Sequence, residues 1–421
     1  MNAAHLHMPM VVAVVSRRFE SSILALGALL VIGALVSGLA RRSFVSLTAL
    51  FVLAGFVLGD GGIQAVHFVS RSGFVSELAT VALIVILFRD GLEVEGEMLQ
   101  SHWHLPFRKL VLAMPLTAVI VAVAARLLTS LSWTEAFLLG ALLSPTDPVL
   151  SSSVVTNPHV PRLVRHSLNL ESGLNDGLAL PAVLVLAAAL QTGGSHFVWW
   201  KFVLESLAIG FGVGLGVGLV AARVIPRGTG LVEGIPPHQK SLYALGVACV
   251  AYGLAVLTPH GNGLIAVYVA AIALGIQRPD IRGYFERQAA DLVEIVKLGI
   301  FVVFGSLLTV HGLLHSGWAA VGVVAVTLLI ARPIAVFAAL VGSATDTATR
   351  AFMSWFGPKG VATMTFSLLV LSEQISAGSE IFNLAALTVF CSILVHGVTD
   401  TAGAEWLAER SRRAAAGSTA Q

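Results

Sequence analysis

Two acids, an amide and a hydroxyl interrupt an apolar stretch of this chain. The segment reads Asn-Leu-Glu171-Ser172-Gly-Leu-Asn175-Asp176-Gly and continues as Leu-Ala-Leu-Pro-Ala-Val-Leu-Val-Leu. On a helix, Glu171 and Asn175 share one face and Ser172 and Asp176 share another, because residues four apart lie one above the other. Ionisable groups inside a bilayer are costly and usually mark an ion or proton path. These residues therefore predict a cation or proton site.

Asp176 is the candidate for direct chemistry. It lies in the middle of the stretch, and its own helix offers no basic residue nearby. Hard cations prefer oxygen ligands, which Asp176, Ser172, Thr146 and carbonyls freed at neighbouring prolines would supply. Burial disfavours the charged form of a carboxyl group, so such an aspartate can hold either a proton or a small cation. Asn175, in place of a second acid, leaves one titrating group in the pair.

The composition identifies the environment of this site. Of the 421 residues, 56% are hydrophobic and only 11% are charged, and the mean hydropathy is +0.88. Soluble domains carry about a quarter charged residues, so the chain reads as an all-α polytopic membrane protein. Cys249 and Cys391 lie in different apolar runs and give neither a disulfide framework nor a metal-site spacing. We expect no cofactor and no nucleic-acid partner.

About thirteen apolar runs are long enough to cross a bilayer. They lie near residues 21–40, 43–59, 74–90, 108–128, 133–155, 162–190, 198–223, 240–258, 261–276, 291–310, 315–341, 349–372 and 379–398.

An odd number of spans fits the distribution of charge. A cytoplasmic carboxyl terminus places most Lys and Arg residues of the connecting segments, Lys109 among them, inside, as the positive-inside rule requires. We therefore expect the amino terminus outside, residues 1–20 as a short lead-in, and residues 401–421 as a short cytoplasmic tail.

Two of the spans are interrupted by proline beside a charge. The fifth reads Leu-Leu-Ser-Pro-Thr146-Asp147-Pro-Val, and the twelfth reads Trp-Phe-Gly-Pro-Lys359-Gly-Val. Broken helices are tolerated inside a membrane only where the freed backbone groups line a cavity or are otherwise satisfied. The breaks lie seven spans apart, which predicts two inverted six-helix repeats, joined by span seven, with crossed broken helices at a transport site. Ordinary proline kinks in packed helices are the alternative.

The remaining buried charges call for partners. Glu171 and Asp147 read as structural acids, because a buried charge must be paired and the chain offers Arg332 and Lys359 within or near apolar spans. Opposite charges at a broken helix would also offset the dipoles of the half-helices. Asp90 ends span three in an acidic segment that we expect to be solvated, although Asp90 could also cap the helix end.

The motifs Ser-Pro-Thr-Asp-Pro-Val, Glu-Ser-Gly-Leu-Asn-Asp-Gly, Ala-Arg-Pro and Gly-Pro-Lys-Gly occur in the order seen in NhaP-type antiporters. From about residue 20 to 400 the chain resembles this branch of the monovalent cation:proton antiporters, which includes the sodium/proton exchangers. The resemblance implies that Asp176 alternately carries a cation and a proton. It implies Thr146 and Ser172 as further ligands of the monovalent cation, and Asn175 as the residue that orients the crossed helices.

The resemblance also implies supporting ion pairs, Glu171 with Arg332 and Asp147 with Lys359. Position 359 is lysine where many members of the family carry arginine, and a buried lysine can titrate. An Asn-Asp pair in this family goes with electroneutral one-for-one exchange.

Members of the family are homodimers with a dimerisation scaffold and a moving core. By that likeness residues 21–107 and 238–312 form the scaffold, residues 108–191 and 313–400 form the core, and residues 192–237 contain the linking seventh span.

The sequence thus predicts a secondary antiporter in the plasma (inner) membrane that exchanges Na⁺, or also Li⁺, for H⁺. Exchange of K⁺ for H⁺ is the alternative, because oxygen ligands alone do not set ion size. An intramembrane hydrolase built on Asp147 and Asp176 is a rival from another class, but its usual signatures are missing. A channel fits poorly, because a channel needs a continuous filter or charged rings. We expect a transporter and not an enzyme.

Overall fold

The computed structural model is helical, with no strand in the part of the chain that it describes. It describes residues 24, 27, 28, 31, 47–68, 73–94, 104–147, 160–191, 198–226, 236–343, 345–373 and 375–418.

The helices follow the apolar runs of the sequence. In chain order they are α2 (Leu47–Leu58), α3 (Gly73–Glu93), α5 (His104–Arg108), the π-helix η1 (Lys109–Ala113), α6 (Met114–Leu128), α7 (Trp133–Leu143), α9 (Arg162–Gln191), α10 (Trp199–Val224), α11 (Pro237–Leu257), α12 (Gly263–Gln277), α13 (Pro279–Gln288), α14 (Ala290–Ser306), α15 (Val310–Leu314), α16 (Gly317–Ala325), the π-helix η3 (Val326–Ala331), α17 (Arg332–Ala339), α18 (Thr347–Trp355), α19 (Val361–Ser372) and α20 (Gly378–Ser418).

Six helical stretches among the described residues are long and apolar enough to cross a membrane, and a seventh results if the pair α12 and α13, bent by 113°, counts as one span. The six are His104–Leu128, Arg162–Gln191, Trp200–Val224, His238–Leu257, Gly317–Ala339 and Gly378–Arg410.

The expected number of thirteen spans is therefore not established. The first predicted span, 21–40, falls almost wholly outside the described residues, and so does the second part of the fifth. The twelfth is split into α18 and α19, which are separated by residues 356–360.

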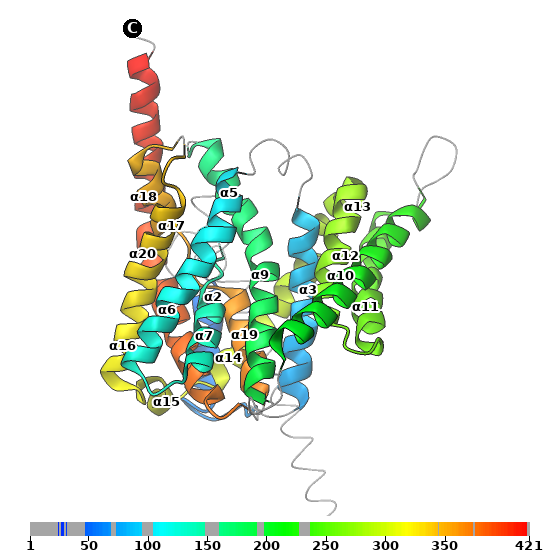
Figure 1. Ribbon diagram of the computed structural model, residues 1–421, viewed down its shortest axis with the longest axis horizontal. Helices are drawn as coiled ribbons and strands as arrows, with labels where there is room; N and C mark the ends of the chain where they lie inside the picture. Colours follow the sequence, from blue (N-terminus) through cyan, green and yellow to red (C-terminus); the bar gives the residue numbers. More distant parts are fainter. Residues whose placement is uncertain are drawn as a thin grey trace, which may run out of the picture.

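The helices form one bundle with a central layer (Figure 1). Helices α10, α11, α12 and α13 gather on one side, and α6, α16, α17, α18 and α20 gather on the other. Between them, α3 packs against α9 and α19 as well as against α12. The last helix, α20, runs for 41 residues and projects beyond the bundle, so the predicted tail begins as a helical continuation of the last span.

Two spans contain a π-helical turn just before a proline. The turn η1 is followed by Met114-Pro115, and the turn η3 is followed by Arg332-Pro333. Proline cannot donate the backbone hydrogen bond of a helix, and its ring clashes with the carbonyl of the preceding turn. A π turn widens the helix at that point, and such turns are common at functional sites. Both spans continue through the proline as single stretches, His104–Leu128 and Gly317–Ala339.

The fifth and twelfth spans break at the predicted positions and meet there. Helix α7 ends at Leu143, and residues 145–147 that follow are not helical. The Asp147 N–H donates a hydrogen bond to the Pro358 carbonyl at 2.8 Å, which joins the two breaks directly. The crossing of the two broken spans is the frame on which the candidate site is built.

Candidate functional site

Asp176 lies half-buried in the middle of α9, where α3 packs against that helix. The carboxyl group of Asp90, on α3, lies within side-chain hydrogen-bonding reach of Asp176. Two carboxyl groups can share a hydrogen bond only if one of them carries a proton. The pair is therefore a place where either a proton or a cation can lie between two acidic side chains.

The expectation that Asp90 lies in a solvated segment is wrong. Helix α3 continues to Glu93, so Asp90 is held inside the bundle and is only 3% exposed. Arg89 donates to its Oδ1 atom from Nε at 2.9 Å and from Nη2 at 2.6 Å. The signal in the sequence was a lone Arg-Asp pair at the end of a long apolar run, followed by the apolar Gly91-Leu92 rather than by a turn.

Asn175 connects α9 to the break of the fifth span. Its Nδ2 atom donates to the Thr146 carbonyl at 2.6 Å and to the Thr146 hydroxyl at 3.2 Å. Both residues are buried, and Asn175 Oδ1 has no partner among the described atoms. Ser172 is half-buried one turn before Asp176 on the same face. The four residues predicted to handle the cation thus lie on α9 and on the broken segment that Asn175 holds against it.

The charges at the two breaks cap helix ends. The Lys359 ammonium donates to the carbonyls of Ser144 and Pro145, at 3.3 and 3.2 Å, where α7 ends. The Asp147 Oδ2 atom accepts from the N–H of Val361 at 3.4 Å, where α19 begins. A cation at a helix C-terminus and an anion at an N-terminus are both favourable. The sequence predicted that Asp147 faces Lys359; in the structure each of them also lies at the end of the half-helix from the other span.

Glu171 is held by two cations. Arg332 donates from Nη1 to Oε1 at 2.9 Å and from Nη2 to Oε2 at 3.4 Å, and Lys109 donates from Nζ to Oε2 at 2.7 Å. The structure thus brings Glu171 and Arg332 together and adds a lysine that the sequence analysis placed among the cytoplasmic charges. That placement is wrong, because α5 begins at His104 and leaves the Lys109 side chain with no exposure.

A glycine in the twelfth span makes the Arg332 contact possible. A Cβ atom on Gly357 would collide with the Nε and Cζ atoms of Arg332. The guanidinium also donates to the Phe356 carbonyl at 3.1 Å, so it lies flat against the broken segment. Glycine is the residue that permits such a close approach.

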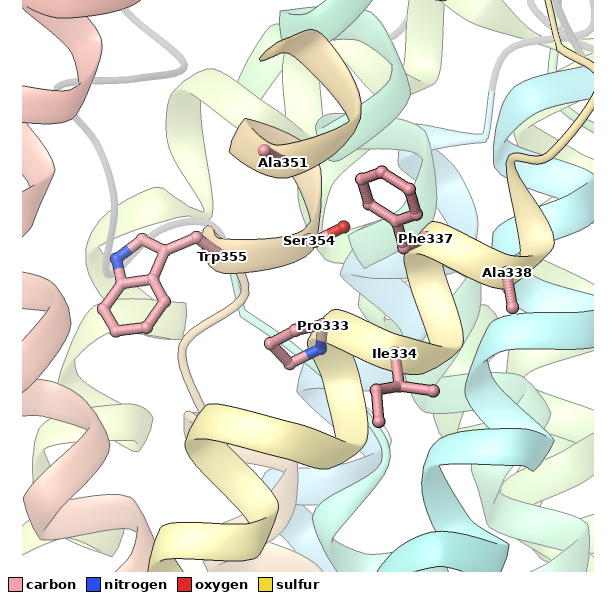
Figure 2. Close-up of a pocket in the computed structure, with 7 residues that line it drawn as sticks. All are labelled: Pro333, Ile334, Phe337, Ala338, Ala351, Ser354 and Trp355. Carbon is pink, nitrogen blue, oxygen red and sulfur yellow. The ribbon is translucent and has the colours of Figure 1, made fainter. Parts of the chain in front are cut away.

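An apolar pocket lies between α17 and α18, beside this network in the chain but different in chemistry. Figure 2 shows Pro333, Ile334, Phe337 and Ala338 on one wall and Ala351, Ser354 and Trp355 on the other. Its volume is about 550 Å³, and its lining contains no acidic or basic side chain. The pocket offers nothing to a cation, in contrast to the cluster around Asp176.

Known proteins share both this sequence pattern and this fold. The family described as "Sodium/hydrogen exchanger, transmembrane" matches residues 27–404, which is most of the chain. The chain belongs to the sodium/hydrogen exchanger family. It is therefore an integral multi-pass membrane protein and a cation/proton antiporter.

Relatives and solved structures agree with this assignment. The chain is 25% identical to "K(+)/H(+) antiporter NhaP" of Alkalimonas amylolytica over 391 residues, covering 92% of this chain and 67% of that protein. It is also 25% identical to "K(+)/H(+) antiporter NhaP2" of Shewanella oneidensis, covering 91% of this chain and 67% of that protein. The sodium proton antiporter MjNhaP1 of Methanocaldococcus jannaschii superposes with a TM-score of 0.78 at 20% identity, covering 92% of this chain and 99% of that one. The last likeness shows the fold.

We expect loss of Glu171 to destabilise the protein more than loss of Arg332. Glu171→Gln leaves two buried cations without a counter-charge, whereas Arg332→Met leaves Glu171 paired with Lys109. Breaking a buried ion pair by removing one partner costs about 3–5 kcal/mol, and we expect a loss of this order for Glu171→Gln and a smaller one for Arg332→Met. Thermal unfolding of both variants in the same detergent measures the difference. Equal melting temperatures for Glu171→Gln and the parent would contradict the assigned pairing.

Proposed function

We propose that this antiporter exchanges Na⁺ for H⁺ and that both ions compete for Asp176. The observation that carries the proposal is the position of Asp176, which shares a hydrogen bond with Asp90 and lies near the crossing of two broken helices. Thr146 and Ser172 are the further oxygen ligands. Asn175 fixes Thr146, and the pairs around Glu171 and the charges Asp147 and Lys359 hold the crossed helices in place.

K⁺ is the second candidate for the transported cation. The bacterial relatives above are named K⁺/H⁺ antiporters, whereas the family description and the structural neighbour name sodium. The proposed ligands are all oxygen atoms, which accept Na⁺, K⁺ and Li⁺ alike. Proton flux in proteoliposomes, measured after addition of each ion in turn, ranks the three.

The division of labour among the helices follows from the same proposal. Residues 108–191 and 313–400 carry the crossed helices and form the moving core, and residues 21–107 and 238–312 form a scaffold through which two copies associate. The protein lies in the plasma (inner) membrane, with the carboxyl terminus in the cytoplasm, in agreement with the distribution of basic residues. Alternating access then moves the core, with its bound ion, against the scaffold.

Transport is expected to be abolished in Asp176→Asn. This substitution keeps the shape of the side chain and removes the group that would exchange a proton for a cation. The matched control is Asp291→Asn, at an exposed acid at the start of α14, which we expect to transport like the parent. Na⁺-driven proton flux by purified Asp176→Asn in proteoliposomes, at the rate of the control, would overturn the assignment.

The apparent affinity for the cation is expected to weaken as pH falls. Each proton bound to Asp176 blocks the site for the cation, so the apparent KM for Na⁺ rises with proton concentration while the saturating rate changes little. At high pH the return of the proton becomes limiting, which makes activity bell-shaped in pH. Initial rates over a matrix of pH and Na⁺ concentrations measure both effects. A KM that is constant across the active pH range would argue against a shared site.

Exchange is expected to be electroneutral, one proton for one monovalent cation. Asn175 carries no proton, Glu171 is paired with two cations, and Asp90 is paired with Arg89. With those groups fixed, Asp176 moves the same net charge in both directions. Membrane voltage, worth roughly 2.3 kcal/mol per charge per 100 mV, then has no influence on the equilibrium.

The test imposes a valinomycin potential on proteoliposomes whose opposed Na⁺ and H⁺ gradients balance for one-for-one exchange. No net flux should appear at any imposed potential. Voltage-driven flux from this balance point would show that a second group, such as Lys359 or Asp90, releases a proton during the cycle.

A further inference from the structure

Lys109 has no part in the proposed function, yet it is among the most buried polar side chains of the described chain. Its Nζ atom lies 2.7 Å from Glu171 Oε2 and 3.1 Å from the carbonyl of Ser167. Arg332 alone would neutralise Glu171. A second buried cation on the same carboxylate costs desolvation free energy, so its presence calls for an explanation beyond charge balance.

The contacts of Arg332 show what Lys109 adds. Arg332 makes one short bond to Glu171, from Nη1 to Oε1 at 2.9 Å. Its other terminal nitrogen, Nη2, is 3.4 Å from Oε2 and is shared with the Phe356 carbonyl at 3.1 Å. Oε2 is therefore held chiefly by Lys109, and the two cations together fix the rotation of the carboxylate.

The fixed carboxylate reaches the cation ligands through a short chain of contacts. The Thr146 hydroxyl is oriented toward Glu171 Oε1 at 3.5 Å. The same threonine is bound through its carbonyl and hydroxyl by Asn175, at 2.6 and 3.2 Å. A rotation of the Glu171 carboxylate would therefore change the position of the Thr146 oxygen atoms.

The two cations come from matching places in the two halves of the fold. Lys109 is the first residue of the π turn η1, and Arg332 directly follows the π turn η3. Each turn precedes a proline, Pro115 in the fourth span and Pro333 in the eleventh, and these spans are equivalent in the predicted inverted repeats. The turn η1 packs against both α9 and α17, which carry Glu171 and Arg332.

We propose that Lys109 is a positioning residue for cation binding: with Arg332 it clamps the Glu171 carboxylate between two proline-induced π turns and so sets the position of Thr146. The inference rests on the proposed function, because its readout is cation transport. Lys109 itself touches neither ion.

The test compares Lys109→Met and Lys109→Arg with the parent in Na⁺-driven proton flux. Lys109→Met removes the charge at similar length, and the fold is expected to survive on the remaining Glu171–Arg332 pair. We expect the apparent KM for Na⁺ to rise about 10-fold, the effect typical of losing a group that orients a metal ligand, with the saturating rate nearly unchanged. Lys109→Arg, which keeps the charge, should restore much of the affinity.

The matched control is Lys240→Met. Lys240 is also a largely buried lysine in an ion pair, 3.6 Å from Asp280, but it lies at the start of α11, away from the crossing. We expect its KM to equal that of the parent. In a Glu171→Gln background, Lys109→Met should raise the KM no further, because Lys109 acts through Glu171.

Two results would overturn the positioning role: a folded Lys109→Met protein with the KM of the parent, or a Lys109→Met protein that does not fold. Failure of the proposed function gives a different result. In that case the parent itself shows no cation-driven proton flux, or Asp176→Asn keeps the flux.

Discussion

The structure depends on two helix ends that lie inside an apolar bundle. When α7 stops at Leu143 and α18 stops at Trp355, backbone groups lose their helical partners in surroundings that offer little water. The Asp147 N–H satisfies the Pro358 carbonyl, the Lys359 ammonium satisfies the carbonyls of Ser144 and Pro145, and Asp147 accepts from the N–H of Val361. Each break thus provides what the other lacks. This mutual requirement keeps two distant parts of the chain together.

Helix α9 uses that crossing as a reference for the site. Asn175 binds the broken segment through Thr146, and Glu171 is held on the same side of the helix by Arg332 and Lys109. The next residue after Asn175 is Asp176, which these contacts place toward Asp90 on α3. The acid that handles the ions therefore lies between helices assigned to the core and a helix assigned to the scaffold. A movement of one against the other would change its surroundings, as alternating access requires.

Much of this arrangement could be predicted from the sequence, because the constraints are local. Length and hydropathy locate the helices, Pro beside Asp147 and Lys359 locates the breaks, and the four-residue spacing of α9 separates the two polar faces. The partners that the sequence missed, Asp90 and Lys109, lie near the ends of apolar runs. There, composition alone cannot distinguish a residue that faces solvent from one that the helix carries one turn further into the bundle. The helix boundaries at Glu93 and His104 decide both cases, and such boundaries depend on tertiary packing.

The central claim is that one cation displaces one proton at Asp176. The most direct measurement combines binding of radiolabelled Na⁺ to the purified protein in weakly buffered detergent solution with the number of protons released per ion bound. The account predicts one proton for each Na⁺ near the midpoint of the pH profile, and neither binding nor release in Asp176→Asn. Na⁺ binding without proton release, or equal binding by Asp176→Asn, would contradict it.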